Sequence, residues 1–274
     1  MAAGDLPTSF VDLGDLHFAY SEVQGPRPPL IMMHGVTGNR HTWNPVLPYF
    51  KNNYHLYTID HRGHGNSSHH PGTYHIDRMA EDVAGFIESV IQKPVLVLGH
   101  SMGGRIALKL AAERTDLVLA VVLEDPPLAY GPSVETNKEF FEFLLDLKNR
   151  DLPEEECCRE IAAFNGSDDL EIFRYKAQTL VQMDANVIEL LLEKQLWSGD
   201  GWNEQMAQVP CPALLLQADT ERGGVMDEDL DSIPELQAAN WEWRRYPGTG
   251  HSIHAEIPED FSRDVINFFR KDHG

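Results

Sequence analysis

The chain has 274 residues, and its 22 lysines and arginines against 43 aspartates and glutamates give a formal net charge of −21. Hydrophobic residues make up 42% of the sequence and aromatic residues 9%, which is typical of a globular protein and excludes a disordered or collagen-like chain. A surface this acidic repels nucleic-acid phosphates and anionic lipid headgroups, so we expect neither nucleic acid nor a membrane as a partner.

The first ten residues lack the basic and apolar regions of a signal peptide, and no apolar run approaches the roughly 18 residues of a membrane span. The three cysteines are an odd number, and Cys157 and Cys158 are sequence neighbours that are badly placed to form a disulfide with one another. These features predict a cytoplasmic protein, and they leave open whether it forms a homodimer.

The chain begins with two short alternating segments, Ser9 to Leu13 and Leu16 to Glu22, joined by a Gly14-Asp15 turn that predicts a β-hairpin. Short, continuous apolar runs follow, as expected for strands buried on both faces, and helical stretches separate them. The runs are Leu30 to Met33, Tyr54 to Ile59, Val95 to Leu98 and Val118 to Leu123, with helices expected over Thr42 to Phe50, Asp77 to Gln92 and Met102 to Arg114. This alternation predicts a mostly parallel sheet built from right-handed crossovers.

The strand pattern stops between Pro126 and Val209, where only helical stretches occur. These stretches are Asn137 to Lys148, Glu154 to Phe164, Leu170 to Met183 and Asn186 to Leu196. Strands resume at Ala213 to Gln217 and Trp241 to Tyr246, and a helix over Glu259 to Lys271 ends the pattern. We therefore predict an α/β core domain of residues 1–125 and 210–274, with residues 126–209 inserted as a helical lid over the carboxyl ends of the strands.

The strongest motif is Gly99-His100-Ser101-Met102-Gly103-Gly104, which links a buried strand directly to a helix. Gly-x-Ser-x-Gly in this context predicts a nucleophile elbow, a strained turn that exposes the Ser101 hydroxyl at the edge of the sheet. The helix N-terminus beneath the serine favours negative charge, so it can stabilise an oxyanion.

The chain resembles proteins of the α/β-hydrolase fold from about Leu16 to the last helix. The motifs that carry the resemblance occur in the family's order: His34-Gly35, Asp60 to Ser67, Gly99 to Gly104, and Gly248-Thr249-Gly250-His251. The resemblance implies a mostly parallel central sheet with helices on both faces and a helical lid. It also implies a catalytic triad in the chain order Ser, acid, His, as in serine esterases and lactonases of this fold.

On this resemblance, His251 is the base that takes the proton of Ser101. The carboxylate that orients His251 is expected just after the strand Ala213 to Gln217, where Asp219 and Glu221 compete. Asp219 is the first acid after the strand and is our first choice, whereas the commonest family spacing favours Glu221. Some relatives carry the acid one strand earlier, which makes Asp125 or Glu124 a third option.

The resemblance also assigns the oxyanion hole to the backbone N–H groups of Val36 and Met102. A histidine cluster near the first motifs lacks the His-x-His-x-Asp-His pattern of metal-dependent lactonases, so we expect no metal. Its members are His61, His64, His69, His70 and His75. We read His100 as a packing residue and His254 as a neighbour of the base. No phosphate-binding glycine motif follows a strand, so no nucleotide or other cofactor is expected.

The predicted activity is cofactor-free hydrolysis of a small, largely apolar carboxylic ester or lactone through an acyl-enzyme. Ser101-Met102-Gly103-Gly104-Arg105 is also similar to the menaquinone-pathway synthase of this fold, so a C–C bond hydrolase or lyase is the alternative. That enzyme needs basic residues for a carboxylate-rich substrate, and the lid offers Lys138, Lys148, Arg150, Arg159, Arg174, Lys176 and Lys194. A ligand-binding receptor that kept the fold is a further alternative. The apolar lid residues fit an apolar pocket or the lid core; they are Phe140, Phe141, Phe143, Leu144, Phe164, Phe173, Leu191, Trp197 and Trp202.

Overall fold

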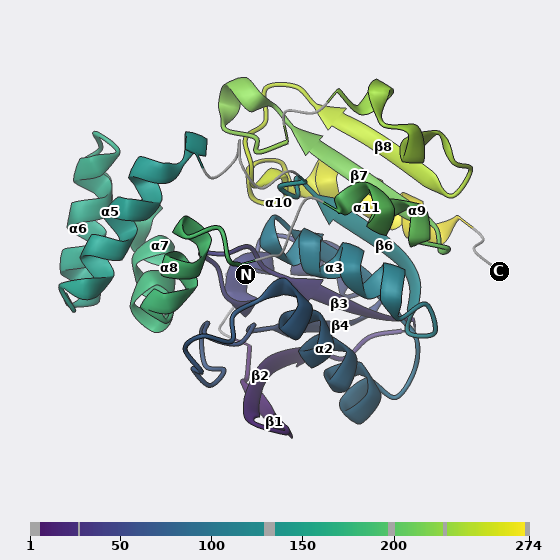
Figure 1. Cartoon of the computed structure of the whole chain (residues 1–274), viewed down its shortest axis with the longest axis horizontal. Coiled ribbons are helices and arrows are strands. Elements are labelled where there is room, and N and C mark those ends of the chain that lie inside the picture. The colour runs from purple at the N-terminus through teal and green to yellow at the C-terminus, as the bar shows by residue number, and fades with distance from the viewer. Residues whose placement is uncertain (1–5, 27, 129–134, 197–200, 227–228, 272–274) are drawn as a thin grey trace.

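The computed structural model describes residues 6–26, 28–128, 135–196, 201–226 and 229–271. Its centre is one eight-stranded sheet in the order β1-β2-β4-β3-β5-β6-β7-β8 (Figure 1). The strands are β1 (Ser9–Leu13), β2 (Leu16–Val23), β3 (Pro29–Met33), β4 (His55–Ile59), β5 (Val95–His100), β6 (Val118–Glu124), β7 (Ala213–Ala218) and β8 (Trp241–Tyr246). The strands β3 to β8 pair in parallel, and β1 and β2 pair antiparallel, as do β2 and β4. The predicted hairpin and mostly parallel sheet are therefore confirmed.

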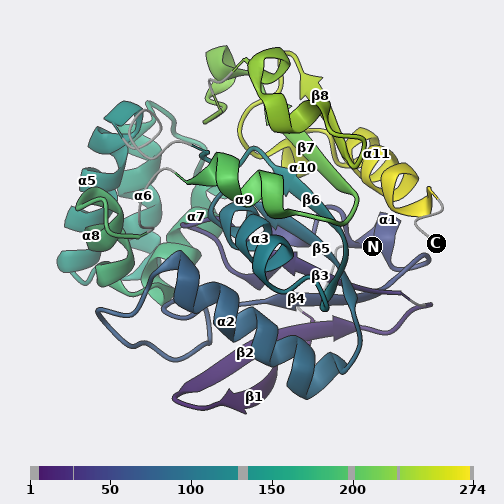
Figure 2. The same cartoon turned by 45° about the vertical axis from the view of Figure 1, so that its right-hand side comes forward.

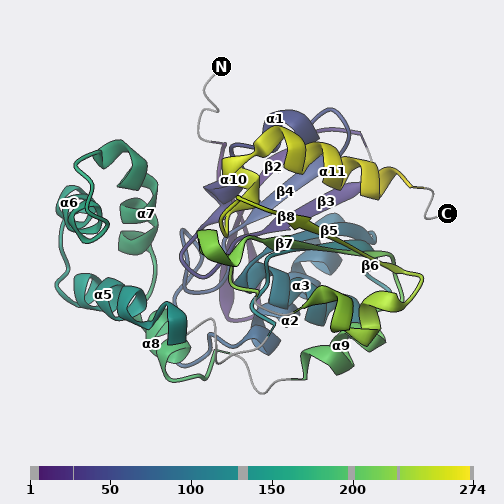
Figure 3. The ribbon, with the colours of Figure 1, turned by 90° about the horizontal axis from the view of Figure 1, so that it is seen from above.

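Helices cover both faces of the sheet (Figures 2 and 3). On one face lie α2 (Ile76–Phe86), α3 (Met102–Glu113) and α9 (Trp202–Gln208), and on the other lie α1 (Leu47–Phe50) and α11 (Pro258–Arg270). Alternation along β3 divides the core accordingly, because Ile31 and Met33 pack with α2 and α3 whereas Leu30 and Met32 pack with α1 and α11. Burial on both faces explains why the strands are continuous apolar runs.

Two helix predictions need correction in detail. The stretch from Thr42 to Phe50 is not one helix but a 3₁₀ turn at Arg40–Trp43 followed by the short helix α1, because Pro45 interrupts the helical hydrogen bonds. The stretch from Asp77 to Gln92 is α2 continued by a π-helical turn at Ile87–Ile91, and it ends at Gln92 in a left-handed conformation.

Between β6 and β7 the described residues form helices α5 (Lys138–Asn149), α6 (Glu154–Phe164), α7 (Leu170–Gln182), α8 (Ala185–Leu192) and α9. Helices α5 to α8 pack on one another and stand together beside one end of the sheet, whereas α9 contacts α3 on the face of the sheet (Figure 3). Among the described helices, none is both long enough and apolar enough to span a bilayer.

Candidate active site

Ser101 occupies the turn between the end of β5 and the start of α3. Its backbone has φ 55° and ψ −118°, which is a strained conformation for a residue with a side chain. Two glycines permit this turn, since a Cβ on Gly99 would collide with the Gly103 carbonyl, and a Cβ on Gly103 would collide with the Met33 carbonyl. The predicted strand-turn-helix geometry is thus present around Ser101, where α3 begins.

His251 lies in the loop after β8, and its partner is Asp125, the residue that follows β6. The His251 Nδ1 and Asp125 Oδ2 atoms are 2.6 Å apart. The Asp125 side chain is fully buried, and it also accepts hydrogen bonds from the backbone N–H groups of Ala218 (3.1 Å) and Val225 (2.8 Å). Three donors therefore fix this carboxylate, which in turn fixes the ring of His251 and leaves Nε2 as the basic nitrogen.

The expectation that Asp219, or alternatively Glu221, contacts His251 is not met. Asp219 instead accepts hydrogen bonds from the backbone N–H groups of Gly248 (2.7 Å) and Glu221 (3.0 Å), which lower the pKa of its carboxyl. It caps the 3₁₀ turn at Thr220–Arg222, and Glu221 is exposed on that turn. The Asp219 carboxylate is bonded to backbone amides and not to His251. Asp125, which belonged to the third option, is therefore the candidate acid that orients His251.

Val36 and Met102, the expected oxyanion-hole residues, line the same cavity as Ser101 and His251. The Val36 loop comes very close to the nucleophile, since a Cβ on Gly35 would lie 3.1 Å from Ser101 Cβ. Close packing of this loop against the elbow places the backbone of residues 35 and 36 where it can meet a carbonyl bound at Ser101.

Two buried histidines support the Val36 loop: His34 of the first motif, and His64 of the predicted histidine cluster. His34 Nδ1 is 2.8 Å from the Gly35 carbonyl, and His64 Nε2 is 2.8 Å from the Val36 carbonyl. Burial holds the pKa of His34 and His61 well below the ordinary value, so both rings are neutral at neutral pH. His69, His70 and His75 pair elsewhere, with Asp184, Ser68 and the Gln195 carbonyl respectively.

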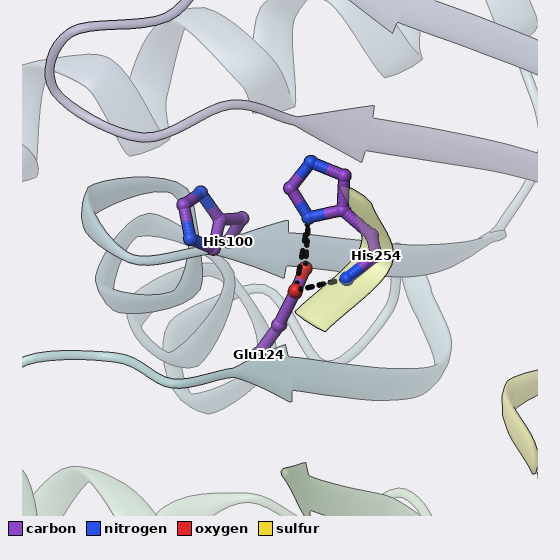
Figure 4. A group of neighbouring side chains, drawn as sticks. All are labelled: His100, Glu124 and His254. Carbon is purple, nitrogen blue, oxygen red and sulfur yellow. Dashed lines mark hydrogen bonds and ion pairs between the residues drawn. The ribbon is translucent and has the colours of Figure 1, made fainter. Parts of the chain in front are cut away.

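A second histidine–carboxylate pair, Glu124 with His254, lies close to His100 (Figure 4). Glu124, the residue before Asp125, accepts hydrogen bonds from the backbone N–H of His254 (2.8 Å) and from its ring Nδ1 (2.9 Å). The neighbouring His100 Nε2 is 3.1 Å from the carbonyl of His251, and burial lowers the pKa of His100 well below its ordinary value. Adjacent acids at the end of β6 therefore hold both His251 and His254.

Among the described residues, His100, Glu124 and His254 have ligand atoms close enough to hold a metal ion, all within 4.8 Å of one another. All three are buried, and internal hydrogen bonds already occupy Nδ1 of His254, the Glu124 carboxylate and Nε2 of His100. The Glu124 carboxylate is already bonded to the backbone N–H and the ring of His254, so we read the three residues as a structural hydrogen-bonded group.

We expect Glu124→Gln to lower the free energy of unfolding by about 2 kcal/mol, because it weakens two buried hydrogen bonds to a charged acceptor. Urea denaturation measures this loss. The control is Glu160→Gln, which removes an exposed carboxylate paired with Arg150 and should cost at most about 1 kcal/mol. Equal stabilities of the two variants would contradict a role for Glu124 in holding the His254 segment.

The nucleophile and the base open into a cavity of about 620 Å³. Its apolar wall comes from both the core and the α5–α8 region, and its residues are Met102, Pro127, Phe140, Phe141, Leu191 and Leu196. A polar part holds Thr37, Thr42, Tyr175 and Lys176. The Tyr175 and Thr42 hydroxyls are 2.6 Å apart, and burial raises the pKa of Tyr175 to about 12.

Sequence patterns did not single out this polar part. Of the apolar residues predicted for the lid, three line the cavity, namely Phe140, Phe141 and Leu191. The rings of Phe143 and Phe164 stack with their centroids 4.2 Å apart, and Leu144 is buried in the core. Phe173 and Trp202 also pack against the core, and Trp197 lies outside the described residues. The apolar residues of the predicted lid thus divide between lining the cavity and packing on one another or in the core.

Comparisons with known proteins agree with this architecture. A sequence model of the alpha/beta hydrolase fold matches residues 28–258. The chain is 28% identical over 275 residues to the sn-1-specific diacylglycerol lipase ABHD11 of Mus musculus, covering 94% of this chain and 86% of that protein. It is 31% identical over 126 residues to the 2-(acetamidomethylene)succinate hydrolase of Mesorhizobium japonicum, covering 46% of this chain and 44% of that protein.

The fold is also similar to that of solved structures. The crystal structure of E-2-(acetamidomethylene)succinate hydrolase superposes with a TM-score of 0.76 and 21% identity, covering 97% of this chain and 99% of that one. The family match spans most of the chain, and the strand order of the mostly parallel sheet agrees with it. The chain therefore belongs to the alpha/beta hydrolase fold family.

Proposed function

We propose that this protein is a cofactor-free serine hydrolase that cleaves a carboxylic ester or lactone through an acyl-enzyme. One observation carries the proposal: Ser101 sits on a strained turn and shares a cavity with His251, whose Nδ1 is held by the buried Asp125. The similarity to a diacylglycerol lipase, an ester hydrolase by name, supports it.

In the proposed reaction, Ser101 Oγ attacks the ester carbonyl while His251 Nε2 takes the serine proton. The backbone N–H groups of Val36 and Met102 stabilise the oxyanion, and Asp125 stabilises the imidazolium without itself taking the proton. His251 then gives the proton to the leaving alcohol, and the acyl-enzyme forms. In the second half His251 deprotonates a water molecule, which attacks the acyl-enzyme. The acid leaves as His251 returns the proton to Ser101 Oγ, which restores the free enzyme.

We propose that the insertion predicted over residues 126–209 acts as a lid and that its moving part is α5 to α8. These helices supply Phe140, Phe141 and Leu191 to the cavity wall, which suits a small and largely apolar substrate. Helix α9 contacts α3, so we assign it to the base of the lid.

The C–C lyase alternative has less support from the lid cations. Five of the seven pair with carboxylates, namely Lys138, Arg150, Arg159, Arg174 and Lys194. The Nζ of Lys148 donates to the Val181 carbonyl at 2.6 Å. Of the seven, Lys176 alone is among the cavity-lining residues, whereas a carboxylate-rich substrate calls for several cations.

The test is a hydrolysis screen of short and medium acyl p-nitrophenyl esters and of lactones, with EDTA present, together with labelling by a fluorophosphonate. We expect turnover that resists the chelator and a phosphonyl group mapped to Ser101 by peptide mass spectrometry. If the folded protein cleaves nothing and Ser101 stays unlabelled, the receptor or lyase alternatives replace this proposal.

A further inference from the structure

Lys176 on α7 projects its ammonium group toward the polar part of the cavity. Its Nζ donates a hydrogen bond to Thr37 Oγ1 at 2.6 Å and lies 5.8 Å from the centroid of the Phe140 ring. Within the part of the chain that the structure describes, this ammonium forms no ion pair with a carboxylate, although the protein carries 43 acidic residues. Five exposed cations of the predicted lid, in contrast, are paired with carboxylates, namely Lys138, Arg150, Arg159, Arg174 and Lys194.

The absence of a paired acid has an energetic consequence. Burial lowers the pKa of Lys176 to about 8, so the side chain is still mostly charged at neutral pH but is poorly solvated. A charge held in a partly dry cavity without a counter-ion is stabilised when an anion binds there. A purely apolar substrate would not compensate the unfavourable free energy of the poorly solvated ammonium.

The position of Lys176 indicates which part of a substrate would meet it. Thr37 follows Val36 in the chain, so the ammonium lies next to the loop that we assign to the oxyanion hole. Its charge also acts on His100, the neighbour of Ser101, and contributes to the lowered pKa of that histidine. An anion bound at Lys176 would therefore lie beside the loop that we assign to the oxyanion hole, in the cavity that holds Ser101.

We propose that Lys176 and Thr37 form a carboxylate subsite, and that the substrate is an ester or lactone bearing a carboxylate near the carbonyl that is attacked. The Lys176 ammonium supplies the charge, and the Thr37 hydroxyl, which accepts from Lys176, can donate its own proton to the same carboxylate. The apolar wall of Phe140, Phe141 and Leu191 then holds the remainder of the molecule. This inference rests on the proposed serine hydrolase function.

Two esters of the same shape test the subsite: monoethyl succinate, and ethyl 4-methylpentanoate, in which two methyl groups replace the carboxylate oxygens. Lys176→Met is expected to raise KM for monoethyl succinate about 10- to 100-fold. It should leave KM for the neutral ester within about threefold of the wild-type value. Lys176→Arg should restore part of the preference. The control is Lys194→Met, which removes a cation paired with Glu135. It should leave KM unchanged for both esters.

The pH dependence gives a second readout that simple loss of packing would not reproduce. As pH rises through 8, Lys176 loses its proton, so KM for monoethyl succinate should rise relative to KM for the neutral ester. Around the ammonium, Tyr175 stays neutral because its pKa is raised to about 12, and His100 stays neutral because its pKa is lowered. His41, His251 and His254 line the same cavity, and the ratio of the two KM values cancels effects that they exert on both esters.

Binding to the inactive Ser101→Ala variant separates failure of the subsite from failure of the proposed function. By calorimetry, monoethyl succinate should bind this variant more tightly than the neutral ester, and the added Lys176→Met change should abolish the difference. If neither these esters nor the screened esters and lactones are hydrolysed and Ser101 stays unlabelled, but this binding difference is found, the subsite stands and the hydrolase proposal falls. The subsite is overturned if Lys176→Met changes neither the hydrolysis nor the binding of monoethyl succinate relative to the neutral ester. That outcome leaves the hydrolase proposal unaffected.

Discussion

Replacing Asp125 by asparagine is expected to lower kcat by about 10²- to 10⁴-fold, whereas Asp219→Asn should leave kcat within about threefold of the wild type. Asp125 Oδ2 accepts the proton on His251 Nδ1 at 2.6 Å, and that bond keeps Nε2 unprotonated for Ser101. An asparagine amide can donate to Nδ1 instead, which forces the proton onto Nε2 and removes the base. The buried carboxylate also stabilises the imidazolium of the transition state, and a neutral amide does not.

Asp219→Asn is a suitable control because it makes the same chemical change one strand away. Its carboxylate binds the Gly248 and Glu221 amides, and an asparagine oxygen can accept from either. Initial rates with a p-nitrophenyl ester give kcat, and the Nδ1 proton of His251, followed by NMR, reports the tautomer independently of turnover. A large loss in Asp219→Asn together with a small one in Asp125→Asn would reverse the assignment of the acid.

The sheet could be predicted from the sequence because strands buried on both faces are continuous apolar runs, and each of these runs forms a strand. Helix α3 and the elbow were accessible for a related reason. Gly99 and Gly103 are required by backbone contacts so close that no side chain fits, and such a requirement is visible as a local motif. The single helix expected over Thr42 to Phe50 does not form, because Pro45 has no N–H for the helical hydrogen bonds that the apolar pattern predicts.

The carboxylate that orients His251 could not be predicted from the local sequence pattern, because Asp125 and Asp219 both follow strands that end at the same edge of the sheet. The geometry distinguishes them through long-range contacts: Asp125 meets amides from Ala218 and Val225, and Asp219 is captured by its own turn. The contact between Lys176 and Thr37 joins residues 139 positions apart. No periodicity or spacing reports such a contact, so the polar part of the cavity emerged only from the fold.

Ser101→Ala is expected to lower kcat by about 10³- to 10⁶-fold without loss of the fold, because it removes the nucleophile and leaves His251, Asp125 and the oxyanion loop in place. The residual rate would come from binding and from the oxyanion hole alone. Initial rates with a p-nitrophenyl ester, compared with the rate without protein, measure the effect. Retention of more than about 1% of wild-type kcat in a protein free of wild-type contamination would exclude Ser101 as the nucleophile.

Ser101→Gly extends this prediction to the strain at the elbow. Both variants lack the hydroxyl and should be equally inactive, but alanine keeps the Cβ that disfavours φ 55° and ψ −118°, whereas glycine does not. We expect the glycine variant to be more stable than the alanine variant by about 1 kcal/mol in urea denaturation, even though glycine also gains freedom in the unfolded chain. Greater stability of the alanine variant would mean that the turn stores little strain. In that case the position of the Ser101 hydroxyl would depend on the packing of Gly99 and Gly103 and not on a strained backbone.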